Sequence, residues 1–225
     1  PKVFIKREVV LTPEQLQAYN DMKTMALALF DQGMTTTVNA LTQLMRLHQI
    51  TCGHTKLDDG TEINIPTNRV TEMLSVVEET SGKVIIWAGY RHDIESIKLA
   101  LQKEYGMAAV GTYYGDTDDE ERRRVVREFQ DMDSELRFFV GNPRTGGYGL
   151  TLTAASTVVY FSNSFDLEVR LQSEDRAHRI GQTKSVTYVD LFVPGTIDEK
   201  IVKALRAKIN IANEVLGEEA KAWLI

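Results

Sequence analysis

Cysteine and long apolar runs are almost absent from this chain of 225 residues. Its one cysteine, Cys52, has no partner for an internal disulfide, and this cysteine with the four histidines of the chain does not give four zinc ligands at the spacing of a typical site. We therefore expect a buried thiol and no metal centre. No stretch of about 18 apolar residues occurs, so a membrane span is excluded and no membrane partner is expected.

An excess of positive charge is also missing, because the formal net charge is −6. This balance argues against a protein that binds nucleic acid over its whole surface, but it is compatible with a local basic groove. Hydrophobic residues make up 43% of the chain and charged residues 26%, as in an ordinary globular protein. The length suits one large α/β domain with additions, or two small domains.

The first 80 residues predict a mostly helical segment with a short hairpin excursion. Thr12 and Gln15 form a capping box around Pro13, which predicts a helix that begins there. Before it lies an extended stretch, Val3–Leu11. The other elements expected in this segment are helices over 36–50 and 67–80 and a hairpin turn over 58–62.

From residue 81 to 225, short apolar runs alternate with amphipathic helices. The runs "KVIIWA", "MAAVGTYY", "LRFFVG", "TVVYFS" and "VTYVDLFV" predict five strands of a parallel sheet with helices on both faces. Thr117 with Glu120 predicts a capping box for the helix that follows the second run. Ligands of open α/β sheets bind beyond the carboxyl ends of the strands. The loops at those ends begin at Gly89, Gly115, Gly141, Ser162 and Pro194.

One of these loops, "GNPRTGGYGLTLTAAS" over 141–156, is rich in glycine and carries an arginine. Its glycines allow backbone N–H groups to point at an oxyanion, although a surface loop of no special function has the same composition. No GxxxxGK[ST] loop occurs anywhere, and no acidic strand end offers a magnesium ligand. The chain therefore has parts that bind an anion but lacks those that hold a nucleotide β-phosphate and its metal.

A second anion-directed pattern is "QSEDRAHRIGQT", over 172–183. Arg176 and Arg179 are three residues apart, and Gln172 is four residues before Arg176. If a helix covers 168–179, all three share one face. Such a stripe is either a solvated helix surface, with the arginines paired to Glu174 and Asp175, or a grip for an anion.

These residues resemble known motifs. "QSEDRAHRIGQ" is similar to motif VI (QxxDRxHRxGQ) of the Swi/Snf-type ATPases of helicase superfamily 2, and "PRTGGYGLTLTAA" resembles their motif V. "KVIIWAGYRHDIESI" resembles motif IV, "YYGDTDDEERRRVVREF" the segment after it, and "LTQLMRLHQITCGH" the helix that precedes this lobe. The ordered similarity runs from about Val9 to Leu216.

The resemblance implies a RecA-like C-terminal lobe over 81–225, preceded by an inter-lobe segment over 1–80. In that family ATP, with Mg²⁺ held mainly by the N-terminal RecA-like lobe, binds between the two lobes, and the protein is a DNA-stimulated ATPase that translocates on duplex DNA. Arg176 and Arg179 would be the catalytic arginine fingers. Further ATP-binding residues would be Gln172, Gly147, Gly149 and Asp175. The DNA-binding residues would be Gly89, Tyr90, Arg91, Gly115, Asn142 and Arg144.

Several positions depart from the family pattern. Pro143, Thr145 and Thr151 stand where the family has Thr, Ala and Asn, and Pro143 removes an N–H at a position where the family's threonine would contact DNA or relay between the two sites. These changes suggest a divergent branch of bacterial or phage origin, acting in the cytoplasm, or in the nucleus if the source is eukaryotic. We expect no activity without the first lobe. The competing interpretation is a non-catalytic nucleic-acid-binding or regulatory module that keeps the lobe's fold.

Overall fold

The structure is a computed structural model that describes residues 1–32, 37–57, 59–145, 149–179, 182, 184–209, 211 and 219–224. The chain divides into two compact units. The sheet unit consists of Pro1–Arg7, Val70–Ser164 and Glu168–Leu191, and the helical unit of Glu8–Arg69, Phe165–Leu167 and Phe192–Ile225. The chain thus passes between the units several times, and the division at 80/81 remains our proposal for the domain organisation.

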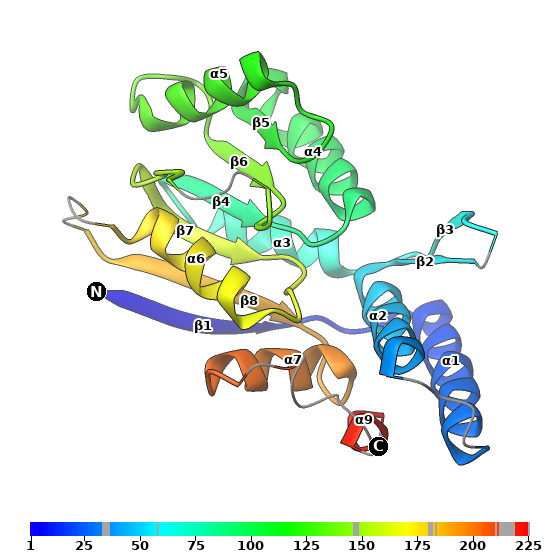
Figure 1. Ribbon diagram of the computed structural model, residues 1–225. Coiled ribbons are helices and arrows are strands. Elements are labelled where there is room, and N and C mark those ends of the chain that lie inside the picture. The colour runs from blue at the N-terminus through cyan, green and yellow to red at the C-terminus, as the bar shows by residue number, and fades with distance from the viewer. Residues whose placement is uncertain are drawn as a thin grey trace. The chain divides into compact units, whose positions relative to one another are not determined.

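The sheet unit is built on six strands in the order β1-β8-β7-β4-β6-β5 (Figure 1). The central strand β4 pairs in parallel with β6 and β7, so that Trp87 lies opposite both Gly141 and Tyr160. All five strands predicted from the apolar runs are present, and the parallel α/β fold is confirmed. The strands are β4 (Lys83–Trp87), β5 (Val110–Tyr113), β6 (Phe138–Gly141), β7 (Ala155–Tyr160) and β8 (Val186–Phe192).

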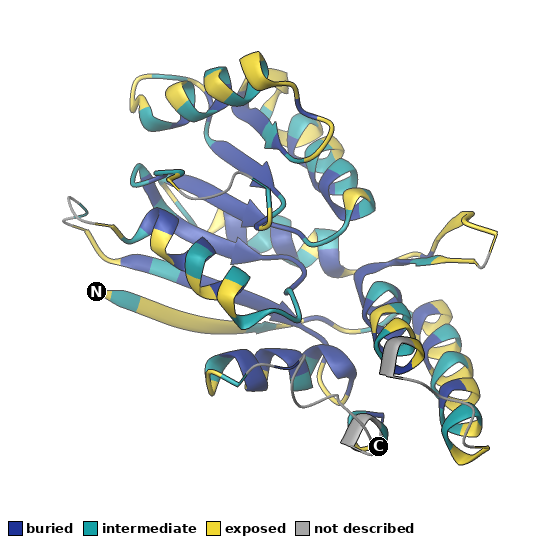
Figure 2. Ribbon diagram, in the orientation of Figure 1, coloured by how far each residue is buried: buried dark blue, intermediate teal, exposed yellow. Residues whose placement is uncertain are grey.

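The sixth strand, β1 (Lys2–Glu8), comes from the extended stretch at the start of the chain. Pro1 O accepts a hydrogen bond from Val186 N at 3.1 Å, and Phe192 O accepts one from Val9 N at 2.8 Å. Both segments therefore advance in the same direction, and β1 is a parallel edge strand beside β8. Figure 2 shows the difference this makes to burial, since β1 is largely exposed while the inner strands are buried.

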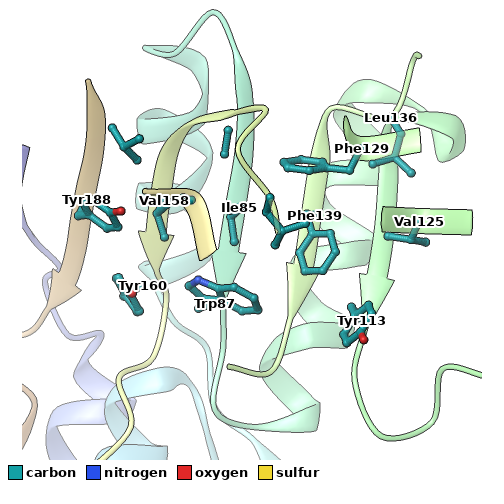
Figure 3. Close-up of a cluster of buried hydrophobic side chains, with 14 residues drawn as sticks. Ile85, Trp87, Tyr113, Val125, Phe129, Leu136, Phe139, Val158, Tyr160 and Tyr188 are labelled. Atoms are coloured by element: carbon teal, nitrogen blue, oxygen red, sulfur yellow. The ribbon is translucent and has the colours of Figure 1, made fainter. Parts of the chain in front are cut away.

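Helices cover both faces of the sheet. On one face α5 (Asp119–Gln130) and α6 (Leu167–Ala177) pack over side chains that alternate along the strands, among them Ile85, Phe139 and Val158 (Figure 3). On the other face lies α4 (Arg91–Tyr105), whose Tyr105 ring is 4.8 Å from that of Phe138. A one-turn 3₁₀ helix, Met107–Ala109, leads into β5, and α3 (Arg69–Glu78) precedes β4.

The start of α5 differs from the prediction. Its N-cap is Asp118, whose Oδ1 accepts hydrogen bonds from Glu120 N at 3.0 Å and Glu121 N at 2.9 Å. The capping box predicted from Thr117 and Glu120 is wrong, because the Thr117 hydroxyl is already used one turn earlier. It accepts from Tyr114 N at 3.2 Å within the loop that leaves β5.

The helical unit contains α1 (Pro13–Asp31), α2 (Thr37–Cys52), α7 (Ile197–Arg206) and the short α9 (Glu219–Ala222), with a hairpin of β2 (His54–Lys56) and β3 (Glu62–Asn64). The predicted capping box of α1 is confirmed, and Gln15 also donates to Ile50 O at 2.8 Å, which ties α1 to α2. Cys52 is buried, as expected. None of the described helices is long and apolar enough to span a membrane.

Candidate functional site

Arg176 is in the last turn of α6, above the carboxyl end of β4. The residue is 5% exposed, and its guanidinium carbon lies 5.1 Å from the centroid of the Trp87 ring. Its Nη1 donates weakly to Thr145 O at 3.4 Å. Among the described residues no carboxylate pairs with it, and burial lowers the pKa of its guanidinium from the ordinary value, against the opposing influence of Tyr113 and Tyr160. A buried cation of this kind favours an incoming anion.

Arg179 does not share a helical face with Arg176. The helix predicted over 168–179 ends at Ala177 because outside donors take its last carbonyl groups. Leu152 N donates to Arg176 O at 2.9 Å, and Gln182 Nε2 donates to Ala177 O at 3.3 Å. Arg179 is exposed and donates through Nη1 to Thr151 Oγ1 at 2.9 Å.

The two arginines therefore contact opposite ends of the glycine-rich loop, Arg176 at Thr145 and Arg179 at Thr151. Gly149 within this loop has φ +115°, a conformation that glycine adopts without strain. An added Cβ there would meet nothing within 4 Å, so the backbone is open. Gly147 was also expected to bind ATP, but it lies outside the described residues.

The other two ATP-binding candidates take part in ion pairs and hydrogen bonds on α6. Gln172 donates to Glu168 Oε1 at 2.8 Å, one helical turn earlier. Asp175 is exposed and accepts from Lys2 Nζ at 2.9 Å. Both lie on the helix that carries Arg176, but neither side chain contacts the glycine-rich loop in any bond recorded for the described residues.

Three of the DNA-binding candidates lie where β4 and β6 end. Asn142 Nδ2 donates to Gly89 O at 3.1 Å, and its Oδ1 accepts from Arg144 N at 2.8 Å. Gly89 N donates to the buried hydroxyl of Ser162, which in turn donates to Asp93 Oδ2 at 2.7 Å. Asn142 thus binds the carbonyl group of Gly89 and Ser162 binds its N–H group, and together they fix the loop after β4.

The remaining DNA-binding candidates surround the same edge of the sheet. Tyr90 is the N-cap of α4, and the next residue, Arg91, forms an exposed ion pair with Asp116 at 2.7 Å. Gly115 is open, since a Cβ there would meet nothing within 4 Å, and its carbonyl accepts from Arg122 at 3.3 Å. Arg144 is exposed in the loop after β6.

The basic run on α5 is largely paired with its own helix and neighbouring loop. Arg124 bridges Glu121 and Glu128, each at 2.6 Å, and the bond to Glu121 raises its pKa. Arg122 donates to Tyr114 O at 2.9 Å. Of the four arginines of this run only Arg123 and Arg127 are exposed, so much of its positive charge is already paired within the helix and the neighbouring loop.

Sequence reasoning missed two residues of this region. Trp87 packs against Arg176, and its only sequence signal is a large aromatic residue at a strand end. Arg170 lies on the buried face of α6, although its i,i+4 spacing from Glu174 predicts an ordinary ion pair on an exposed helix surface. A parallel sheet with arginines and an open glycine-rich loop at its carboxyl edge has the architecture of a RecA-like lobe.

Comparison with known proteins agrees with this class. Residues 67–181, slightly more than half of the chain, match the helicase conserved C-terminal domain. The chromatin-remodeling ATPase INO80 of Homo sapiens is 33% identical over 148 residues, 64% of this chain and 9% of that protein. The TATA-binding protein-associated factor MOT1 of Saccharomyces cerevisiae is 34% identical over 140 residues, 61% of this chain and 7% of that protein.

The fold is similar to a solved structure, the Sulfolobus solfataricus SWI2/SNF2 ATPase core in complex with dsDNA. The TM-score is 0.79 at 24% identity, over 100% of this chain and 50% of that one. The chain belongs to the helicase conserved C-terminal domain family and is a C-terminal lobe of the Swi/Snf type. It spans less than a tenth of the two curated relatives described above.

Proposed function

We propose that this chain is the second motor lobe of a DNA-stimulated ATPase that translocates on duplex DNA. The observation that carries the proposal is the buried guanidinium of Arg176, which has no carboxylate partner among the described residues. A desolvated, always-charged group is costly unless an anion approaches it. Arg179, at the other end of the same glycine-rich loop, supplies a second cation.

The residues present suit a phosphate rather than its metal. Arg176, Arg179 and the open backbone at Gly149 are donors to oxyanions. ATP, when bound between this lobe and an N-terminal lobe, supplies the γ-phosphoryl group. Here the two guanidinium groups stabilise the charge that develops on it, worth about 10³–10⁵ in rate for a finger in related NTPases. In this proposal Mg²⁺ is held mainly by the N-terminal lobe, Gln172 and Asp175 flank the fingers, and Gly147 and Gly149 line the pocket.

The DNA contacts would be made at the ends of β4, β5 and β6. Arg91 and Arg144 are exposed there and supply positive charge, and the backbone at Gly115 is open to an approaching phosphate. Such contacts to phosphate position a duplex without reading its sequence. In this scheme Tyr90 and Asn142 orient the same loops.

The test measures ATP hydrolysis by the chain alone and by a protein that joins it to its N-terminal lobe, each with and without duplex DNA. We expect turnover only in the joined protein, stimulated by DNA, because one lobe holds half of the nucleotide site. Arg176→Ala and Arg179→Ala should each lower kcat by about 10³-fold or more while DNA affinity changes little.

Arg123→Ala is the matched control, since it removes an exposed arginine of the same unit from α5. It should hydrolyse ATP at the wild-type rate. Unimpaired turnover in both finger variants would instead favour a regulatory module that keeps the fold. INO80 and MOT1 are eukaryotic proteins, so these relatives give no support to a bacterial or phage origin. If the source is eukaryotic, we propose that the protein acts in the nucleus.

A further inference from the structure

A cluster of buried charges beneath α6 takes no part in the proposed nucleotide site. Its centre is Arg170, which is 3% exposed. Arg170 Nε donates to Glu174 Oε1 at 2.8 Å, while Nη1 donates to Asp190 Oδ1 at 2.5 Å and to Asn163 Oδ1 at 2.6 Å. One side chain of α6 is thus bonded to its own next turn, to β8 and to the segment after β7.

Further contacts complete the cluster around Arg170. The Arg170 guanidinium lies 3.6 Å above the centroid of the Tyr160 ring, and the Tyr160 hydroxyl pairs with Ser173 Oγ at 2.7 Å. The second oxygen of Glu174 accepts from Lys2 Nζ at 3.3 Å. Arg170 therefore faces Asp190 and Glu174, and Lys2 is shared between Glu174 and the exposed carboxylate of Asp175.

Stability alone is a weak reason for such a cluster, because burying ion pairs costs about as much desolvation energy as their attraction returns. Directional hydrogen bonds instead specify one orientation of the helix about its own axis. A purely apolar helix face packs almost equally well after a small rotation, whereas these bonds are satisfied at one rotation only. Arg170, Ser173 and Glu174 all face the sheet, and Arg176 is half a turn beyond Glu174.

We propose that Arg170 is a positioning residue for the hydrolysis reaction, which fixes the rotation of α6 so that Arg176 is aimed at the transferred phosphoryl group. This inference rests on the proposed function of Arg176. A helix rotation of one residue's spacing, about 100°, would carry Arg176 away from Trp87 and Thr145. Catalysis requires the charge to be held within about 0.5 Å of its productive place.

The first experiment uses the chain itself. Arg170→Met together with Asp190→Asn removes the central ion pair without leaving an unpaired Asp190 carboxylate, and Glu174 keeps Lys2. Hydrogen exchange followed by mass spectrometry should show the amides of residues 171–177 exchanging at least tenfold faster, with β4 and β6 unchanged. Wild-type protection of α6 in this variant would overturn the inference.

The second experiment measures steady-state hydrolysis by the protein that joins both lobes. The Arg170→Met/Asp190→Asn variant should lose at least tenfold in kcat with little change in KM for ATP or in DNA affinity. Arg170→Lys keeps the charge but not the forked geometry, so it should recover part of the loss. An unchanged kcat in the Arg170→Met/Asp190→Asn variant would contradict the positioning role of Arg170.

The matched control is Arg69→Met/Asp198→Asn, which removes another fully buried ion pair, in the helical unit. It should retain kcat at temperatures where both variants are folded. An equal loss in this control would mean that general destabilisation, and not the setting of α6, lowers turnover. Arg176→Ala distinguishes failure of the positioning role of Arg170 from failure of the proposed function. If Arg176→Ala hydrolyses ATP normally, the proposed function itself is wrong.

Discussion

At the scale of single residues, Arg91 is an exposed DNA-binding candidate that already has an anionic partner. Its guanidinium is 2.7 Å from the Asp116 carboxylate, and both side chains are largely in solvent. A phosphate would have to compete with this carboxylate. An exposed pair of this kind is worth up to about 1 kcal/mol, so the competition is modest but measurable.

We therefore predict that Asp116→Asn raises affinity for duplex DNA by about two- to fivefold, which corresponds to the energy of the exposed pair. Fluorescence anisotropy with a labelled duplex at several salt concentrations measures the change. Asp119→Asn removes the same charge from a nearby exposed site, where Asp119 pairs with Arg122 at 3.5 Å. Equal gains in both variants would show a general charge effect rather than release of Arg91.

Tyr114 belongs to the same loop and is held more firmly. Its hydroxyl donates to Glu95 on α4, and this bond together with burial raises the pKa of Tyr114 to about 12. The Thr117 hydroxyl and Arg122 bind the loop's backbone from two other directions. Gly115 is therefore presented on a loop that is braced on both sides, which suits a residue expected to contact a rigid duplex.

At the scale of elements, α5 shows how a helix start is decided by competition for a hydroxyl. Asp118 caps the helix because Thr117 is engaged by the preceding loop. We predict that Asp118→Ala lowers the free energy of unfolding by about 0.5–2 kcal/mol, the usual cost of losing an N-cap. Urea denaturation measures the loss.

Asp119→Ala is the comparison for that cap, because Asp119 is one residue further on and its side chain is 82% exposed. It should change the unfolding free energy by less than about 0.5 kcal/mol. If the two variants lost the same amount, first-turn charge and not the side-chain cap would explain the effect.

The C-terminus of α6 is likewise decided by hydrogen-bonding groups that lie outside the helix. The carbonyl groups of Arg176 and Ala177 are taken by Leu152 N and Gln182 Nε2, two donors from other segments. Gln182 also donates to Thr153 O at 2.8 Å, so it ties the segment after α6 to the glycine-rich loop. This explains why the last Gln of "QSEDRAHRIGQ" has a structural use beside the arginines.

At the scale of the whole molecule, the stability of the helical unit should depend on pH through Asp198. Burial alone would raise the pKa of this carboxyl, but the charges and hydrogen bonds of Arg69 and His48 outweigh it and hold the pKa below its usual value. Arg69 Nη2 donates to Asp198 Oδ2 at 2.8 Å, and neither side chain is exposed.

A folded-state pKa below the unfolded one means that the ion pair stabilises the fold above the unfolded pKa, about 3.9, and that this is lost as the pH falls through the folded value. We predict that Asp198→Asn is less stable than wild type by about 3–5 kcal/mol at pH 7, because the buried guanidinium of Arg69 loses the negative charge that it faces. Urea unfolding from pH 7 to pH 2 should show the difference narrowing below about pH 4. A difference that stays constant with pH would contradict this account.

The sequence by itself determined what depends on neighbouring residues and on composition. The Thr12–Gln15 capping box lies within four residues, and each of the five strands predicted after residue 81 is a short apolar run. The order of the motifs predicted the family, and the spacing of strand ends predicted which loops meet at the carboxyl edge. These signals are local, so they can be read without the fold.

Only the tertiary structure decided matters that depend on contacts between distant segments. The end of α6 at Ala177 depends on Leu152, the capping role of Asp118 on the loop after β5, and the burial of Arg170 on Asp190. β1 became part of the sheet because β8 offered an open edge. In each case the contact that decides the local structure comes from outside the element itself, so the pattern of residues within that element does not reveal it.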